Sequence, residues 1–392
     1  MALNLKISVE RFSMLIRLCL PLFLISNVAL ADPQWQPLVD PYNQVFPSLE
    51  IATAMLVLDP ADADDAVVGD QQGLIYVDLS GARAGAAFEL IIRIPGLAPE
   101  SRLTGRVPAV EGAVSLAPTI GWDYQALAAI KQPRPTSVEF ELKVDGRDLG
   151  KRTLRVRLRS INDALYYIDE ENDDEDLDFN WLFAAYVNED HPAVDLILKE
   201  ALDSGVVDSF SGYQAEDSDE VLKQVYAIWH VLQQRGIRYS SITRTANEHT
   251  HVMSQHVRFI DESLAMTQAN CVDGSVLMAS VLRKIDIAPS LVLVPGHMFL
   301  GFALDEAGTE MAYLETTMLG DVPKKAKRLA APGRVSLGGD VDASLASFEA
   351  AMEEGQRQMD EAGAAFTDEN DFEHQIIDIQ AAREYGVMPI TR

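Results

Sequence analysis

Apolar and polar residues alternate in short segments through the first part of the chain, and turn residues separate these segments. Breakers such as Asp59-Pro60 and Pro95-Gly96 lie between them. A period of two, or a composition rich in β-branched and aromatic residues, predicts strands. The predicted strands cover residues 49–58, 73–80, 87–94, 137–144 and 152–160. Several short strands in succession predict a β-sandwich domain over 32–165.

The spacing of apolar residues changes to a helical period after residue 179. Helices are predicted to dominate 179–285, and the clearest has Ser218 as its expected N-cap and ends at Gly236. Helical spacing returns over 341–362. A last helix is predicted through the apolar positions Phe372, Ile376 and Ile379. The chain therefore has an α+β pattern, with a helical C-terminal extension expected over 336–392.

An acidic segment separates the strand-rich part from the helix-rich part. Eight of the ten residues in "DEENDDEDLD" (169–178) are acidic. Such a segment has too little apolar surface to form a core, so a solvated linker is predicted over 166–178. It lacks the central glycine and the regular ligand spacing of an EF-hand loop. The sequence leaves open whether it binds calcium.

The first 31 residues have the features of a secretory leader. Three basic residues precede an apolar run at 18–28, and Ala29-Leu30-Ala31 supplies a small-x-small cleavage pattern. An exported protein is therefore expected, periplasmic or else secreted. No later stretch is long and apolar enough to predict a membrane span. The net charge of −28 argues against nucleic acid as a partner.

Cys271 is the only cysteine that remains after a leader containing Cys19 is removed. Asn270 before it is a good N-cap residue, and Asp273 would lie in the first turn of the predicted helix. A cysteine at the positive end of a helix dipole is favoured as the thiolate. An unpaired cysteine is more often a small buried hydrophobe, but this position at a helix start points to reactivity.

Two further candidates lie on a predicted hairpin formed by residues 297–304 and 310–317. Pairing Leu304 with Glu310 places most apolar residues of both strands on one face, with Phe299 on the other. His297 and Glu315 then become diagonal neighbours on the opposite face, and their side chains can meet. A register shifted by one residue would separate the pair and scatter the apolar set. The hydrophobic pattern therefore predicts a base and an acid side by side.

The segments "NCVDGSVLMASVLRKIDIAPSLVLVPGHMFLGF" and "YLETT" resemble the transglutaminase-like superfamily of papain-fold cysteine enzymes. The resemblance implies a domain over 179–335, with helices packed on an antiparallel sheet, and acyl transfer without a cofactor. It implies Cys271 as nucleophile, His297 as general base and acid, and Glu315 as orienting acid, where the family usually has aspartate. The second oxyanion donor beside the Cys271 amide would be one of two side chains, Gln255 or Gln268.

The expected function is that of an exported cysteine hydrolase or acyltransferase acting on amide bonds of peptides or proteins. Two alternatives remain open from the sequence. One is a catalytically inactive binding module with the same fold. The other is a metal-dependent hydrolase that uses the cluster His249, His251 and His256, for which no further ligand is evident nearby. These patterns do not determine the substrate or whether the enzyme hydrolyses or cross-links it. They also do not determine the partner of the β-sandwich domain or the oligomeric state.

Overall fold

The structure is a computed structural model with an α+β fold. It describes residues 32–57, 61, 63–169, 176–241, 250–321, 341–368 and 371–391. The predicted leader, part of the acidic linker and the predicted boundary at residue 335 lie outside the described residues. The contacts divide the chain into two compact units. Within the part of the chain that the structure describes, no helix combines the length and apolar composition that crossing a bilayer requires.

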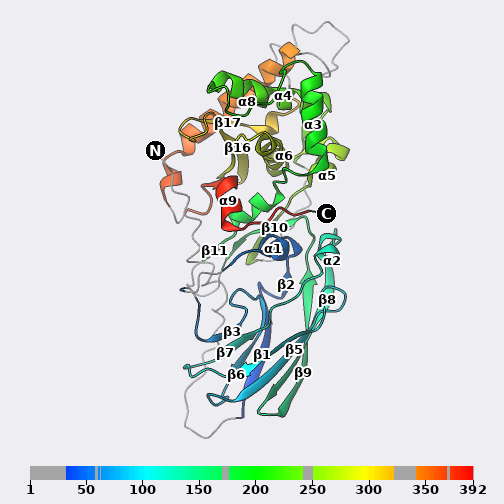
Figure 1. Cartoon of the computed structure of the whole chain (residues 1–392), viewed down its shortest axis with the longest axis vertical. Helices are drawn as coiled ribbons and strands as arrows, with labels where there is room; N and C mark the ends of the chain where they lie inside the picture. Colours follow the sequence, from blue (N-terminus) through cyan, green and yellow to red (C-terminus); the bar gives the residue numbers. More distant parts are fainter. Residues whose placement is uncertain are drawn as a thin grey trace. The chain divides into compact units, whose positions relative to one another are not determined.

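The strand-rich unit contains the described residues up to Phe179, together with 250–254. Its elements, in chain order, are β1 (Gln34–Val39), β2 (Gln44–Val45), α1 (Pro47–Ala52), β3 (Val67–Gly69), β4 (Ile75–Ser80), β5 (Ala87–Arg93), β6 (Ser101–Arg106), β7 (Val114–Ala117), α2 (Tyr124–Ala128), β8 (Arg134–Val144), β9 (Arg147–Leu158), β10 (Asp163–Ile168) and β11 (Leu177–Asp178). Figure 1 shows these strands in blue to cyan-green.

Two sheets of this unit share one hydrophobic core. A four-stranded sheet has the order β1-β4-β7-β3, and a five-stranded sheet has the order β2-β9-β8-β5-β6. Val77 and Leu116 of the first sheet and Leu90 and Phe140 of the second belong to the same buried cluster. Alternating residues face this core because successive side chains of a strand point to opposite faces.

The predicted strands at 73–80, 87–94, 137–144 and 152–160 are confirmed as β4, β5, β8 and β9. The predicted strand at 49–58 is wrong, because its first residues belong to helix α1. Pro47 fits the first turn of this helix, where its missing N–H costs no hydrogen bond. Leu49 and Ala52, three positions apart, form the buried side of the helix.

The second unit contains the described residues of 180–241 and 255–391. Its elements are η3 (Asn180–Tyr186), α3 (Pro192–Asp203), α4 (Ser218–Gln234), β12 (Arg238–Tyr239), α5 (Ile260–Met266), β14 (Gln268–Ala269), α6 (Cys271–Lys284), β15 (Pro289–Val294), β16 (His297–Ala303), β17 (Met311–Leu314), η4 (Thr316–Met318), α8 (Val341–Ala362), η5 (Ala365–Thr367), β18 (Gln375–Asp378) and α9 (Ile379–Tyr385). The remaining strand, β13 (Val252–His256), belongs to the sheet β11-β10-β13, and its residues 252–254 are part of the strand-rich unit.

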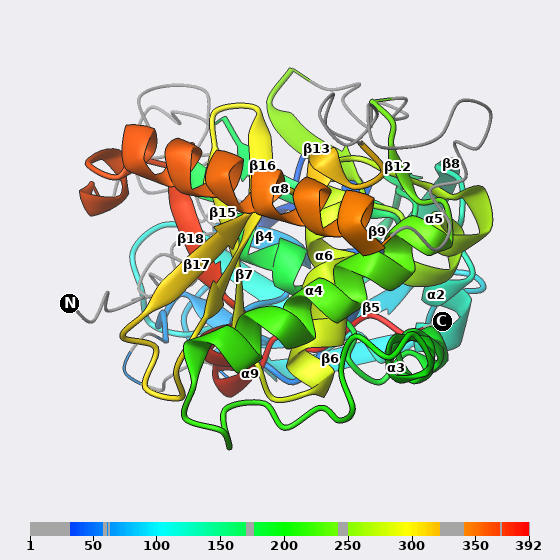
Figure 2. The same ribbon diagram turned by 90° about the horizontal axis from the view of Figure 1, so that it is seen from above.

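The centre of this unit is an antiparallel sheet with the order β17-β16-β15-β18. Helix α6 contacts β15 and β16, and helix α8 contacts β17 and α4. Figure 2 shows α8 running beside α4, with the sheet strands next to them. A Cβ on Gly355 of α8 would lie 2.6 Å from the carbonyl carbon of Tyr313, so glycine is required for α8 to lie this close to β17.

The predicted helix through Phe372, Ile376 and Ile379 is corrected by the structure. Residues Gln375–Asp378 form the edge strand β18, and only α9 after it is helical. Ile377 pairs with Leu291 of β15 and is buried. The sheet offers this segment a row of hydrogen-bonding partners that local helical spacing does not reveal. The predicted C-terminal extension thus contributes a strand to the central sheet.

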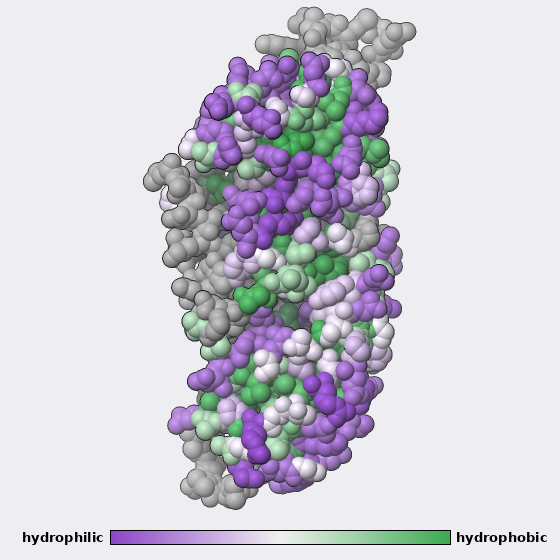
Figure 3. All heavy atoms as spheres, in the orientation of Figure 1, coloured by the Kyte–Doolittle hydropathy of each residue, from purple (hydrophilic) through white to green (hydrophobic). Residues whose placement is uncertain are grey.

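Helices α3, α4, α5 and α6 agree with the helix-rich prediction for 179–285, but the short strands β12, β13 and β14 lie between them, and α4 ends at Gln234, two residues before the predicted Gly236. Helix α4 is capped by Asp217, whose side chain accepts from the Asp219 amide, so Ser218 is its first residue and not its cap. Helix α8 spans 341–362, as its apolar spacing predicts. Figure 3 shows hydrophilic side chains over much of the visible surface, with smaller apolar patches between them.

Candidate functional site

Cys271 is the first residue of helix α6, as the sequence predicts. The Asn270 side chain accepts a hydrogen bond from the Asp273 amide (2.8 Å), and Asp273 accepts one from the Asn270 amide (3.0 Å). This reciprocal capping box fixes where the helix begins. The half-buried cysteine therefore lies at the positive end of the helix dipole, where a thiolate is stabilised.

Asp273 also ties the helix start to the segment before it. Its carboxylate accepts from the backbone amide of Arg258 at 2.7 Å and from Arg258 Nη1 at 2.6 Å. Burial raises the pKa of Asp273, while the hydrogen bonds from Asn270 and Arg258 act in the opposite direction. This carboxylate is fully buried, and its hydrogen bonds give it a role in holding Cys271 in place.

The hairpin that carries His297 has the predicted register. Leu300 pairs with Leu314 and Phe302 with Ala312, and the Leu304 amide donates to the Glu310 carbonyl at 2.8 Å. The second strand is shorter than predicted, since β17 ends at Leu314. Glu315 instead caps η4. This turn redirects the chain at the point where the acid meets the histidine.

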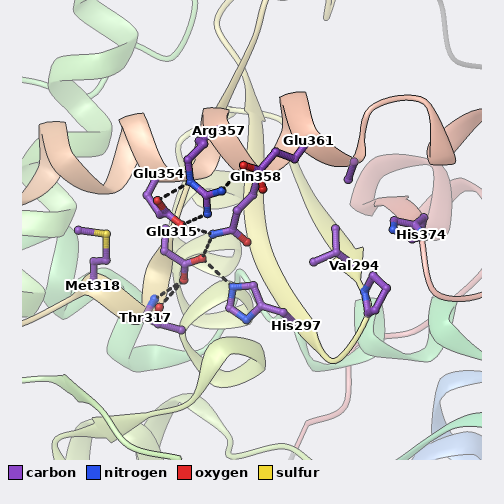
Figure 4. Close-up of a pocket in the computed structure, with 12 residues that line it drawn as sticks. Val294, His297, Glu315, Thr317, Met318, Glu354, Arg357, Gln358, Glu361 and His374 are labelled. Carbon is purple, nitrogen blue, oxygen red and sulfur yellow. Dashed lines mark hydrogen bonds and ion pairs between the residues drawn. The ribbon is translucent and has the colours of Figure 1, made fainter.

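His297 and Glu315 form a hydrogen-bonded pair. His297 Nε2 lies 2.6 Å from Glu315 Oε2, and the side chains are 25% and 4% exposed. The other carboxylate oxygen, Oε1, accepts from the Thr317 amide (2.8 Å) and hydroxyl (2.5 Å). Figure 4 shows the side chains of His297 and Thr317 pointing toward the Glu315 carboxylate. The ring is thus held through Nε2, which leaves Nδ1 for a second partner.

The pKa values of the pair shift in opposite directions. Burial disfavours the charged imidazole of His297, but hydrogen bonding and charge interaction with Cys271 and Glu315 outweigh it and raise its pKa to about 10. Burial likewise acts to raise the pKa of Glu315, but the bonds to His297 and Thr317 prevail and lower it. At neutral pH the histidine is therefore a cation between a carboxylate and a thiol.

Contacts of Thr316 bring the start of α6 against the turn that contains Glu315. The Thr316 hydroxyl donates to the Cys271 carbonyl at 3.4 Å and lies 3.1 Å from Ser275 Oγ. A Cβ on Gly274 would lie 3.0 Å from Thr316 Oγ1, so a larger residue would push the two elements apart. These contacts explain how residues 44 positions apart (271 and 315) belong to one site.

Tyr239 is an exposed residue near Cys271 and Glu315 that sequence reasoning missed. Burial raises the pKa of its phenol, and the nearby charges of Cys271 and Glu315 raise it further. The residue lies on β12, which pairs in parallel with β14 just before the cysteine helix. A two-residue strand far from a motif gives no pattern in the sequence, so only the pairing with Ala269 reveals it.

Gln358 is a second missed residue. Its Nε2 donates to Glu315 Oε2 at 2.6 Å, so this oxygen receives hydrogen bonds from both Gln358 and His297. The Glu315 amide also donates to the Ala351 carbonyl of α8 at 3.0 Å. The sequence contains one sign of this contact. A glycine inside a helical pattern, here Gly355, indicates that the helix closely approaches another element, and Gln358, three positions later, lies on the same face of the helix.

A cavity of about 680 Å³ opens beside the His297–Glu315 pair. Gln358 and Arg357 of α8 line it, and Figure 4 shows them above the pair, with His374 at the far side. Arg357 forms ion pairs with Glu354 and Glu361 of the same helix. Cys271 is not among the lining residues. The cavity therefore lies between α8 and the His297–Glu315 pair, and it does not border the thiol.

The two predicted oxyanion donors have different surroundings. Gln255 lies on β13, and its Nε2 donates to the His256 carbonyl at 3.1 Å. Gln268 lies on β14 and is exposed. Neither makes a hydrogen bond to Cys271 or His297 among the described residues. The role expected for them stays a prediction.

The histidine cluster expected for a metal falls partly outside the described residues, since His249 is not described. The His251 ring stacks on Tyr42, with centroids 5.5 Å apart, and its Nδ1 lies 3.7 Å from an Asp169 oxygen. Among the residues that the structure describes, no group of three or more His, Cys, Asp or Glu side chains is arranged to hold a metal ion.

No protein-family model matches the chain, and no curated protein matches its sequence. The resemblance to transglutaminase-like enzymes therefore rests on the sequence segments that carry it. What the geometry provides is a thiol at a helix N-terminus, an imidazole that interacts with it, and a buried acid that holds the imidazole. This is the set of groups that nucleophilic acyl transfer requires.

Proposed function

We propose that this protein is a transglutaminase-like cysteine hydrolase or acyltransferase that acts on amide bonds of peptides or proteins. The proposal includes a papain-like catalytic domain preceded by a β-sandwich domain. One observation carries it: His297 interacts with Cys271 at the start of α6 and with the buried Glu315. The order of the three residues and the unbroken set of contacts between them support a working site.

In the first half of the reaction, the Cys271 sulfur attacks the carbonyl carbon of the amide. The imidazolium of His297 gives a proton to the nitrogen as the carbon–nitrogen bond breaks, and the amine leaves. The product is a thioester on Cys271. Negative charge that develops on the carbonyl oxygen is stabilised by the amide groups of the first turn of α6.

In the second half, water or an amine attacks the thioester carbon. His297 takes a proton from the attacking group, the carbon–sulfur bond breaks, and the sulfur leaves as the thiolate. Water gives hydrolysis and an amine gives cross-linking. Glu315 keeps its charge throughout, because it holds the ring and stabilises the imidazolium.

The leader-like N-terminal sequence supports export, with the periplasm as the proposed location. An exported enzyme with a thiol nucleophile would meet peptides and proteins of the same compartment as substrates. No cofactor is included in the proposal, since acyl transfer through a thioester needs none.

The test measures both outcomes of the second step on one substrate. Casein labelled with a fluorophore reports hydrolysis, and incorporation of a dansylated primary amine into casein reports transfer. We expect one of these activities in the wild type and neither in Cys271→Ala. Equal activity in both proteins would refute the thiol mechanism. If the wild type shows no activity but its Cys271 is alkylated rapidly, casein is excluded as a substrate and the reactive site stands. If it shows no activity and its thiol is inert, a binding module is favoured.

A further inference from the structure

The second unit has a further cavity, separate from the one beside His297, and its floor is apolar. It lies where α4, α8 and the hairpin of β16 and β17 meet, and we call it the α8 groove. Its volume of about 710 Å³ is within the range of ligand pockets, roughly 300–1,000 Å³. Several of its apolar side chains are only half-buried, so the floor is open to solvent. The described apolar lining consists of Leu222, Leu304, Met311, Ala312, Tyr313 and Met352.

The rim of the α8 groove is acidic. Its charged lining residues, among those that the structure describes, are Glu353, Arg357, Asp360 and Glu361. Arg357 forms ion pairs with Glu354 and Glu361 of the same helix, which balance its charge (Figure 4). Glu353 and Asp360 are exposed, and neither forms an ion pair with a described residue. The groove therefore has two carboxylates that no cation of the described chain neutralises.

These two carboxylates lie on the side of α8 that borders the groove. Glu353 and Asp360 are seven positions apart, which places them on one face of the helix and about 10.5 Å apart along its axis. The Gln356 side chain donates to Asp360 Oδ1 at 2.8 Å, and this leaves Oδ2 for another donor. Burial raises the pKa of the Tyr313 phenol, and the charge of Asp360 raises it further. The Asp360 carboxylate is therefore close to the aromatic side chain of the lining.

An apolar floor with an acidic rim fits a ligand that is both apolar and basic. An apolar side chain on the floor is removed from water, and a cation next to it is attracted by Glu353 and Asp360. Lysine and arginine suit the rim, because an apolar stem carries their charge. Nucleic acid is repelled by the same carboxylates. A second copy of this chain, with a net charge of −28, is disfavoured for the same reason.

From these observations we propose that the α8 groove binds a basic segment of a partner polypeptide, in which lysine or arginine residues flank an apolar residue. Arg357 and Glu361 line both this groove and the cavity beside His297 and Glu315. A segment in the groove is therefore held next to the candidate active site, although neither His297 nor Glu315 lines the groove. The binding requires neither Cys271 nor the thiol chemistry, so it stands or falls apart from the proposed function.

The test uses the full chain and a fluorescein-labelled peptide of the sequence Lys-Leu-Lys-Leu-Lys, with binding followed by fluorescence anisotropy. One control probe, Lys-Gly-Lys-Gly-Lys, has the same charge, and the other, Gln-Leu-Gln-Leu-Gln, has the same apolar residues. We expect the first peptide to bind about tenfold or more tightly than either control, because each control lacks one of the two contributions. Added NaCl should weaken this binding, because exposed charge pairs are screened.

A matched pair of double variants separates the groove from the net charge. Glu353→Gln with Asp360→Asn should weaken binding about tenfold or more, because both unneutralised carboxylates are lost. Asp195→Asn with Asp208→Asn removes the same charge from exposed positions of this unit that do not line the groove, and we expect less than about a threefold change. Equal weakening by both pairs, or equal affinity for the two lysine peptides, would overturn the proposal. Cys271→Ala should bind the probe like the wild type.

Two other occupants of the groove give distinct results in the same assay. Dimerisation of the wild type that the lysine–leucine peptide reverses, measured by analytical ultracentrifugation, would assign the groove to a second copy of the chain. Tighter binding of the peptide by Lys324→Gln with Lys325→Gln would assign it to the basic segment of the chain's own sequence at 324–328. Either result would contradict a partner polypeptide as the occupant.

Discussion

In each of the two units a buried carboxylate faces a cation, Asp163 with Arg159 in one and Glu315 with His297 in the other, and these two pairs differ in what surrounds them. In the strand-rich unit, Arg159 Nε lies 3.0 Å from Asp163 Oδ2, and the side chains are 1% and 4% exposed. In the other unit, Glu315 is equally buried, but its partner His297 is 25% exposed. Arg159 also donates to Gln44 and Ser254, at 2.9 and 2.8 Å.

The difference shows which features separate a structural pair from a reactive one. Arg159 stays charged at all ordinary pH values, and buried protein acceptors surround it. His297 can exchange a proton, borders a cavity and interacts with a thiol. Burial of a carboxylate is therefore common to both pairs, and exposure of a titratable partner beside a nucleophile distinguishes the candidate site.

Removing the nucleophile should have the largest effect. We expect Cys271→Ala to lower amide turnover by about 10³-fold or more, because attack on the carbonyl carbon is lost. Its melting temperature should stay close to that of the wild type, since a half-buried thiol contributes little packing. Turnover is measured with labelled casein and folding by circular dichroism. Retained turnover would assign the chemistry to another group.

Neutralising Glu315 and neutralising Asp163 should give opposite outcomes. We expect Glu315→Gln to lower turnover by about 10²- to 10⁴-fold, because the imidazolium loses its charged partner. Asp163→Asn should leave turnover of folded protein unchanged and lower the free energy of unfolding by about 3 kcal/mol, because Arg159 becomes an uncompensated buried charge. Turnover and urea unfolding are measured on both variants. Similar losses of turnover in the two variants would remove the distinction between the pairs.

The pH dependence should follow His297. Its pKa of about 10 lies above the ordinary 6.5, so protonated His297 stabilises the folded state below pH 6.5, and this contribution is lost as the pH rises through 10. Turnover should fall about tenfold per pH unit above pH 10, since no acid remains to protonate the leaving amine. Rate profiles and melting temperatures between pH 6 and pH 11 check this. A fall near pH 6.5 would show an unpaired histidine.

Removing the hydrogen bond from α8 should have the smallest effect. We expect Gln358→Leu to lower turnover about tenfold, because Glu315 keeps its other donors but its carboxylate can rotate. Gln356→Leu, two positions away on the same helix, is the control and should change turnover less than twofold. If Gln358→Leu lowers the melting temperature but changes neither turnover nor the decline of turnover at alkaline pH, Gln358 has a purely structural role.

Local patterns in the sequence were sufficient for the core of the site. Asn270 and Asp273 cap a helix through contacts within four residues, so the start of α6 was predictable. The hairpin register followed from the single pairing that places its apolar residues on one face. The sequence therefore predicts that His297 and Glu315 lie together.

Features that depend on distant segments were not predictable in this way. Strand β18 forms because β15 offers it a ladder of hydrogen bonds, and the helical spacing of Phe372, Ile376 and Ile379 does not reveal this partner. Gln358 reaches Glu315 across 43 residues, and the packing of α8 on β17 that permits this depends on Gly355. A residue whose role is set by long-range packing leaves little periodic signal in the chain.

The pH dependence of Cys271 alkylation by iodoacetamide tests the central claim most directly, because it needs no substrate. If His297, held by Glu315, stabilises the thiolate, the wild type should react rapidly already at pH 6, and His297→Ala should react slowly there. Identical profiles for the two proteins, each rising only in the range typical of a free cysteine, would contradict the claim.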